Sequence, residues 1–368
     1  MATTYNTLST QATQEPIATT STETINGTTY NVYTYSSAKT FSNDLIILPT
    51  DKLVFYSQTC TFNCNVINCG IFYINGSTCR IKDSKNFTNL HGSFYYSNEG
   101  TTEFEGTPES ERIPGIEYGV TMRSYDCTID ISYPHGDLSK RGDFKVQTGS
   151  TANHYMYKVT PTRTFASDGL LFNDSTSGWT GTGTQTIATA MLLTDTNHFS
   201  GTASNYTLSS NLILSNDTYL WIKPDETLTI HGGNDHKELT CPTRACIINN
   251  GTINAGESVY DYESAKFLIQ GNITNTYVIN IYHHLDLYNT SSNSAYLTLF
   301  NSGTINNYYN LFLQGKVINT NSIIHKNDDT FVSSNSNHQL FINAITPTCF
   351  YGFVKIITKD GLKEIKDL

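Results

Sequence analysis

Four residues with metal-ligating side chains lie at equal intervals in the middle of the chain. His231, His236, Cys241 and Cys246 are each five residues apart, and two imidazoles with two thiolates suit a tetrahedral zinc site. A step of five places successive residues on opposite faces of a continuous strand, so turns in HGGNDH and CPTRAC would have to bring the four together. The other interpretation is surface histidines with either free thiols or a Cys241–Cys246 pair. The spacing favours this second interpretation, and zinc stays the alternative.

Four further cysteines are clustered nearer the N-terminus, at Cys60, Cys64, Cys69 and Cys79. Their spacing matches no standard zinc signature, which has C-x₂₋₄-C pairs separated by a longer loop. Three interpretations remain open for them: two disulfides, buried free thiols, or a metal site.

Carboxylates could cleave glycans if two of them faced each other across a groove, about 5–9.5 Å apart. Neighbours along a strand point to opposite faces, so adjacency in sequence does not predict such a pair. A glycan-cleaving enzyme is therefore only an alternative here. Its candidate acids are Asp225, Glu226, Asp235, Asp261, Glu263, Asp328 and Asp329.

The last twenty residues, CFYGFVKIITKDGLKEIKDL, have a regular pattern of their own. Cys349 precedes a predicted strand that contains Ile356, Ile357 and Thr358. Asp360 and Gly361 predict a turn, and a second strand follows. A plain terminal hairpin with its turn at Lys359–Gly361 accounts for the pattern without any chemistry.

The same block resembles the first conserved block of Hint domains, the self-processing modules of inteins and of the hedgehog C-terminal region. Val354 departs from a frequent Thr in that block. The resemblance implies that the Cys349 thiol attacks the carbonyl of Thr348 to give a thioester, which is nucleophilic catalysis by cysteine. The later T-x-x-H block of the family is not in this sequence. Autoproteolysis at Thr348–Cys349 is therefore expected only in a longer precursor, and we expect no other enzyme activity.

The composition favours an all-β protein. Thr, Ile, Val and Tyr suit a pleated surface, and Asn, Gly and Ser suit turns; no segment holds a helical period. The formal charge of −10, with no basic stripe, argues against nucleic-acid binding. No apolar run reaches the roughly 20 residues of a membrane span. The first twenty residues contain neither the basic nor the apolar region of a secretory signal.

A short motif recurs in the C-terminal half. Two apolar residues, one or two polar residues, a glycine and an Asn-rich step make up CIINNGTINAG (246–256), FLIQGNITNT (267–276), LFNSGTINNY (299–308) and LFLQGKVINT (311–320). A constant motif at irregular intervals predicts a parallel β-helix or β-solenoid with loops of variable length. A β-sandwich or jelly roll is the alternative.

A second resemblance between segments divides the chain. LIILPTDKLVFY (45–56) and LWIKPDETLTIH (220–231) both read strand, Pro, acidic turn, strand. We therefore expect five parts. They are an extended N-terminal arm (1–38), a first β unit (39–145), a loop-rich connecting segment (146–205), a second, solenoid unit (206–345), and the terminal Hint-like block or hairpin (346–368).

Chains of this kind, rich in Asn, Thr, Ile and Tyr with NNGTIN-like steps, resemble structural proteins of large DNA viruses, among which Hint modules occur. The resemblance implies a virion component of minor capsid, spike or fibre type, assembled in the host cytoplasm. Its partners would be other virion proteins and further copies of the chain. The competing function is a β-helix enzyme or an adhesin that acts on or binds host glycans.

Overall fold

The computed structural model describes residues 5–14, 18–106, 119–131, 133–134, 142–161, 180–231, 237–256, 266–282, 284–288, 297–308, 310–314, 316–321, 323–325, 331–334, 339–342, 355–358 and 361–364. The regular secondary structure of these residues is nearly all β-strand, and the helix among them, α1 (Leu8–Gln14), has seven residues. The prediction of an all-β chain is confirmed. The chain divides into two compact units. Unit 1 comprises Met1–Met191, Ser215–Leu220 and Arg244–Ile248, and unit 2 comprises Leu192–Leu214, Trp221–Thr243 and Asn249–Leu368.

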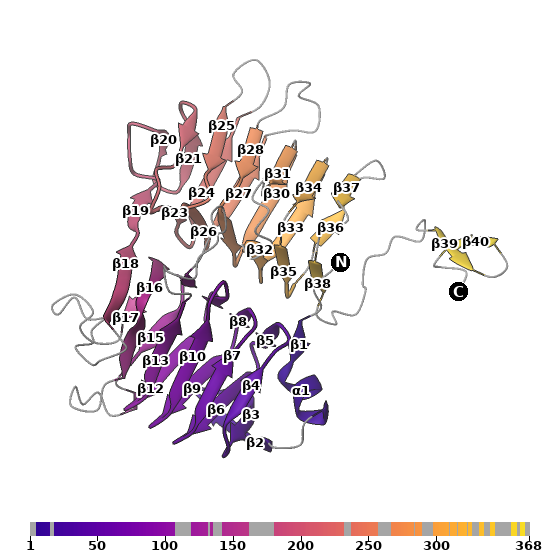
Figure 1. The fold of residues 1–368 in the computed structure, drawn as a ribbon. Helices are drawn as coiled ribbons and strands as arrows, with labels where there is room; N and C mark the ends of the chain where they lie inside the picture. Colours follow the sequence, from indigo (N-terminus) through magenta and orange to yellow (C-terminus); the bar gives the residue numbers. More distant parts are fainter. Residues whose placement is uncertain are drawn as a thin grey trace. The chain divides into compact units, whose positions relative to one another are not determined.

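The strands of unit 1 lie in two sheets (Figure 1). Sheet 1 contains, in spatial order, β1 (Asn6–Thr7), β5 (Leu45–Ile47), β8 (Val66–Asn68), β11 (Asn86–Asn89), β14 (Val120–Tyr125), β16 (Asp143–Tyr157), β13 (Thr101–Glu105), β10 (Thr78–Lys82), β7 (Thr59–Phe62) and β4 (Lys39–Phe41), with β18 (Thr180–Ile187) beside β16. Sheet 2 contains β17 (Thr160–Pro161), β15 (Thr128–Asp130), β12 (Phe94–Asn98), β9 (Ile71–Asn75), β6 (Asp51–Tyr56), β3 (Thr28–Tyr35) and β2 (Ala18–Ile25).

Most of these strands pair in parallel with the third strand before and the third strand after them in sequence. β7, β10 and β13 show this in sheet 1, and β6, β9 and β12 show it in sheet 2. The 15-residue β16 replaces two shorter strands, because its first part pairs with β13 and its second part pairs with β14. The exception is the antiparallel hairpin β2–β3.

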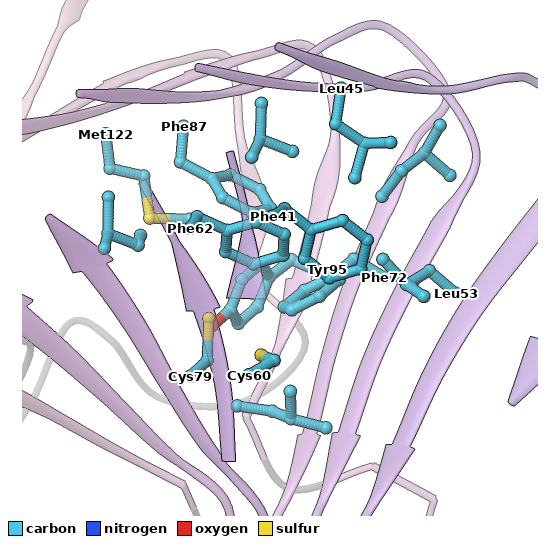
Figure 2. Close-up of a cluster of buried hydrophobic side chains, with 14 of the residues drawn as sticks. Phe41, Leu45, Leu53, Cys60, Phe62, Phe72, Cys79, Phe87, Tyr95 and Met122 are labelled. Atoms are coloured by element: carbon cyan, nitrogen blue, oxygen red, sulfur yellow. The ribbon is translucent and has the colours of Figure 1, made fainter. Parts of the chain in front are cut away.

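Alternation of side chains along the strands produces the core of unit 1. In β7 and β10 the polar residues are partly exposed, whereas Cys60, Phe62, Cys79 and Ile81 are fully buried. Figure 2 shows Cys60, Phe62 and Cys79 converging with Phe41, Phe72, Phe87 and Tyr95 between the sheets. Equivalent rings stack from one strand to the next; the ring centroids of Phe41 and Phe62 lie 5.1 Å apart. Burial of this aromatic surface is the main source of stability for the unit.

The structure differs from the expected N-terminal arm. Strand β1 pairs in parallel with β5, Leu8 of α1 is fully buried, and β3 pairs with β6. Thr-rich and Ser-rich residues suggested an extended arm, but the Tyr and Val side chains of TTYNVYTY are buried on both faces of the strand. Tyr33 and Tyr35 belong to the core of unit 1, and Tyr30 and Val32 belong to a second apolar cluster. Burial of these side chains outweighs the polar composition of the segment.

Three further sheets carry the strands of the C-terminal half (Figure 1). Sheet 3 contains β19 (Thr189–Leu192), β23 (Thr218–Ile222), β26 (Cys246–Asn249), β29 (Asn272–Asn275), β32 (Leu297–Asn301), β35 (Lys316–Asn319) and β38 (Gln339–Ile342). Sheet 4 contains β20 (Phe199–Thr202), β21 (Asn205–Leu208), β24 (Thr227–Ile230), β27 (Thr252–Ala255), β30 (Val278–Ile281), β33 (Thr304–Asn307) and β36 (Ile323–His325). Sheet 5 contains β22 (Leu212–Ile213), β25 (Glu238–Cys241), β28 (Lys266–Ile269), β31 (His284–Tyr288), β34 (Asn310–Gln314) and β37 (Phe331–Ser334).

Unit 2 repeats the same pairing rule, since neighbours in sheets 4 and 5 are again three strands apart in sequence, apart from the antiparallel pair β20–β21. In all four copies of the glycine motif one strand precedes the glycine and another follows it. Two of them, with Gly251 and Gly303, connect sheet 3 to sheet 4, and the other two connect sheet 5 to sheet 3. The irregular glycine spacing therefore arises because one motif serves two different corners.

Two predicted segments remain. The connecting segment, expected to be loop-rich, contains most of β16 and all of β17–β20, and its residues 162–179 lie outside the described residues. In the terminal block, β39 (Lys355–Thr358) and β40 (Gly361–Glu364) form an antiparallel pair in which Thr358 is opposite Gly361. That pair is common to a plain hairpin and to the opening strands of a Hint domain.

Candidate functional site: columns of hydrogen-bonded polar side chains

A column of buried asparagines runs through unit 2. Asn249, Asn275, Asn301 and Asn319 are the last residues of β26, β29, β32 and β35. The first three are fully buried, and Asn319 is nearly so. The Nδ2 group of each donates to the Oδ1 atom of the next, over 2.7, 2.6 and 2.6 Å. A buried amide is costly unless it is paired, and here each amide supplies the partner of its neighbour.

Backbone groups complete the hydrogen bonding of this column. Asn249 Nδ2 also donates to the carbonyl oxygen of Val278, at 2.9 Å, and Asn249 Oδ1 accepts from the backbone N–H of Gly251, at 3.3 Å. Asn275 Nδ2 makes the equivalent contact with the carbonyl of Thr304, at 3.4 Å. The side chains thus bond to the backbone just past the end of their own strand or of the next one, which fixes the corner where sheet 3 leads into sheet 4.

A second column lies on the outward side of sheet 4. Asn306 Nδ2 donates to Asn280 Oδ1, and Asn280 Nδ2 donates to Asn254 Oδ1, each at 2.8 Å. Asn254 Nδ2 lies 3.5 Å from Thr229 Oγ1. These four side chains are partly exposed, so water can replace their hydrogen bonds, unlike those of the buried column.

Unit 1 has a buried column of mixed composition. Asn68 donates to Asn89 at 3.0 Å, Asn89 donates to the Ser124 hydroxyl at 3.1 Å, and that hydroxyl is 3.0 Å from His154 Nε2. All four residues are fully buried. Burial in this apolar setting lowers the pKa of His154 to about 3, so the imidazole is neutral at physiological pH.

A charged cluster lies at the turns that lead from sheet 1 to sheet 2. Asp126 is the centre, with His91 Nδ1 at 2.7 Å from one carboxylate oxygen and Lys158 Nζ at 2.6 Å from the other. Burial alone would raise the pKa of Asp126, but the hydrogen bonds and charges of His91 and Lys158 hold it below its ordinary value. The carboxylate is therefore ionised and engaged on both oxygens, which suits fixing of the turns.

The three described members of the predicted zinc quartet lie in or next to strands of three different sheets. His231 follows β24 of sheet 4, Cys241 ends β25 of sheet 5, and Cys246 begins β26 of sheet 3; His236 lies outside the described residues. Both cysteines are fully buried, and Cys241 Sγ lies 3.9 Å from the carbonyl oxygens of Pro242 and Asn272. Among the residues that the structure describes, no group of three or more His, Cys, Asp or Glu side chains is arranged to hold a metal ion. Zinc at this quartet stays a prediction.

The seven described cysteines are buried, and none of these seven is in a disulfide: Cys60, Cys64, Cys69, Cys79, Cys127, Cys241 and Cys246. Cys60 and Cys79 lie directly opposite each other in β7 and β10, and burial raises the pKa of the Cys79 thiol well above its ordinary value. Burial raises the pKa of the Cys64, Cys69 and Cys127 thiols to about 12. Such thiols are protonated and act as small apolar side chains of the core.

Other predicted site residues remain without a described environment. Cys349, Asp235, Asp261, Glu263, Asp328 and Asp329 lie outside the described residues. Asp225 is exposed in the turn before β24, and Glu226 Oε2 accepts from the backbone N–H of Lys223 at 2.9 Å. The second of these carboxylates therefore stabilises its own turn.

The asparagine columns were not predicted residue by residue, although the sequence carries a signal for them. Every glycine motif contains one column residue, two positions before the glycine for Asn249 and Asn301 and four positions after it for Asn275 and Asn319, and stacking of like residues makes amide columns. In unit 1 the column members differ in type, so the sequence alone offers no pattern that would have found them.

No protein-family description, curated protein or solved structure matches this chain. None of the helices in the described part is long and apolar enough to cross a membrane.

Proposed function

We propose that the chain is a parallel β-helix whose role is structural. The observation that carries the proposal is the buried column Asn249–Asn275–Asn301–Asn319, in which one side-chain position is hydrogen-bonded at four successive strands. Parallel pairing with every third strand is the arrangement of a three-sided solenoid. A sandwich or jelly roll would pair its strands antiparallel.

The polar groups of the columns bond to one another and to the backbone. Networks satisfied in this way stiffen a structure and specify one arrangement of it. A stiff β-helix with an acidic net charge suits a component of a larger assembly, so we propose a virion protein of minor capsid, spike or fibre type. It would assemble in the host cytoplasm with other virion proteins and further copies of itself, for particle assembly or host attachment.

Localisation in purified particles tests this function. Antibodies raised against the purified chain would be used on gradient-purified particles from cells that make the protein, with gold labelling and mass spectrometry as readouts. We expect label on the particles and peptides of the chain in constant ratio to other particle proteins. Peptides confined to the particle-free lysate would contradict the proposal.

We further propose that a precursor continuing beyond Leu368 processes itself at Cys349. The thiol would lose its proton and attack the Thr348 carbonyl carbon, the C–S bond would form as the C–N bond breaks, and the amide nitrogen would take up a proton. The part ending at Thr348 would then be held as a thioester, and a second nucleophile such as water would release it by displacing the Cys349 thiol. The sequence block CFYGFVKIITKDG supports this, with its two strands. Intact mass of the precursor would show cleavage before Cys349, and Cys349→Ala would leave it whole. An uncut natural precursor would contradict the idea.

A further inference from the structure

One exposed tyrosine projects from the turn between β29 and β30 of unit 2. Tyr277 is 56% exposed, one of four exposed large apolar side chains among the described residues. Its neighbours at the same turn are Gly251 and Gly303: the N–H of Val278 donates to the Gly251 carbonyl, and the N–H of Thr304 donates to the Tyr277 carbonyl. Because both neighbours lack a side chain, nothing at these two positions covers either face of the ring.

A line of short polar side chains runs beside Tyr277. Asn250, Thr276, Ser302 and Thr320 each follow a member of the buried asparagine column and are partly exposed. The hydroxyls donate to carbonyl oxygens of the preceding level, Thr276 to Asn249 at 3.1 Å, Ser302 to Asn275 at 3.4 Å and Thr320 to Asn301 at 3.2 Å. With the hydroxyl hydrogens engaged there, these oxygens can act only as acceptors toward a ligand. One lone pair of Thr276 Oγ1 accepts from Asn250 Nδ2, and its other lone pair is left for the ligand.

A second aromatic side chain continues the line. Trp221 is partly exposed, and its Nε1 group donates to Asn250 Oδ1 at 2.8 Å. Asn250 Nδ2 in turn donates to Thr276 Oγ1 at 2.9 Å. Trp221, Asn250 and Thr276 are thus connected by side-chain hydrogen bonds, and this order fixes the orientation of the groups before any ligand arrives.

The chemistry of this ridge is that of a saccharide surface. A pyranose ring has an apolar face of C–H groups, which packs on an aromatic ring, and an edge of hydroxyls, which donate to oxygen acceptors. The four polar side chains of the line are uncharged, and parallel strands repeat them about every 4.8 Å. An anionic saccharide would be repelled by a chain of formal charge −10.

We propose that the ridge formed by Trp221, Asn250, Thr276, Tyr277, Ser302 and Thr320 binds a neutral saccharide chain, with one sugar ring packed on Tyr277. The proposal names the ligand class for the host-attachment part of the proposed function and rests on it. A repeating polymer is the favoured ligand because successive strands offer it similar contacts.

Calorimetric titration of the purified chain tests the ridge. The probes are neutral oligosaccharides of glucose, galactose, mannose and N-acetylglucosamine, together with sulfated and sialylated ones. Tyr277→Ala is expected to weaken binding of the neutral ligand by at least about tenfold. The matched control is Tyr56→Ala, since Tyr56 is 47% exposed in unit 1, and it should bind as the natural chain does.

A conservative pair of variants tests the acceptor line. Thr276→Val keeps the shape and removes the oxygen, so affinity should fall several-fold, whereas Thr207→Val, at a partly exposed threonine of β21, should leave it unchanged. Circular dichroism would show that all variants are folded.

Three results would overturn the proposal: no binding of any neutral saccharide, binding of charged saccharides alone, or equal binding by the Tyr277→Ala and Tyr56→Ala variants. Particle localisation is read separately. Label on particles without saccharide binding would refute the ridge alone, and saccharide binding without label would refute the virion role alone.

Discussion

At the scale of single residues, the middle members of the buried asparagine column have the largest consequences. Asn275 accepts from Asn249 and donates to Asn301, and it is fully buried. Asn275→Ala should lower the free energy of unfolding by about 3 kcal/mol, because it leaves a donor and an acceptor unpaired away from water. Urea denaturation followed by circular dichroism would measure this.

The outward column supplies the matched control. Asn280 has the same relation to Asn254 and Asn306 but is partly exposed, so Asn280→Ala should cost less than about 1 kcal/mol. Equal losses for the two variants would mean that burial of the inner column does not stabilise unit 2.

His154 predicts a pH dependence at the same scale. Its folded pKa of about 3 lies below the ordinary 6.5, so the unfolded chain takes up a proton there before the native one does. The stability that the neutral ring contributes is fully present above pH 6.5 and is lost as the pH falls toward 3, by about 1.4 kcal/mol per pH unit.

The variant His154→Gln should reduce this slope, since an amide can still donate to Ser124 and does not titrate. His198→Gln, at a partly exposed histidine outside this column, is the control and should keep it. Unfolding free energies between pH 6.5 and about 5, where ordinary carboxyls stay ionised, isolate the histidine. An unchanged slope in the His154 variant would contradict the assignment.

At the scale of elements, the corners between sheets limit what the strands can accept. A Cβ atom on Gly303 would lie 2.2 Å from the Tyr277 carbonyl oxygen and 2.5 Å from its nitrogen. Both are backbone atoms of the neighbouring strand level and cannot move alone. Gly303→Ala should therefore lower the unfolding free energy by about 3 kcal/mol, as measured by urea denaturation.

Gly27 provides a control that distinguishes a steric clash of the added Cβ atom from the strain of a positive φ angle. It has φ +82° and no atom within 4 Å of a built Cβ, so Gly27→Ala meets only left-handed strain, about 1 kcal/mol. If the Gly27→Ala and Gly303→Ala variants lost the same small amount of unfolding free energy, the close approach of Gly303 to the Tyr277 backbone would be wrong.

The strands themselves could be predicted from the sequence better than their connections. Alternating apolar residues and the glycine motifs indicated β structure, and 246–256 and 299–308 each fold as strand, turn and strand. The sequence could not show that Gly251 and Gly303 share a corner across intervals of 26 residues, because Tyr277 occupies the turn between them. It also could not reveal that Leu8 is buried, since α1 packs against β5, a strand that is distant in sequence.

At the scale of the whole molecule, the residues that the sequence marked as candidate sites are not the residues that form the polar columns. The sequence drew attention to cysteines and histidines, whereas the described cysteines are core residues and the columns consist of amides and hydroxyls, with His154 as the one imidazole in the columns described. Spacing alone cannot predict this, because residues 18 to 35 positions apart become neighbours only when strands stack. The account therefore rests on columns that join one strand level to the next.

A double-mutant cycle on the asparagine column tests that account most directly. Asn275→Ala and Asn301→Ala, alone and together, should show a coupling of about 1–2 kcal/mol in urea denaturation, because each residue is the other's partner. The pair Asn249 and Asn319, which are not in contact within the column, should show a coupling near zero. Independent, additive losses for Asn275 and Asn301 would contradict stacking of their strands, and with it the proposed β-helix.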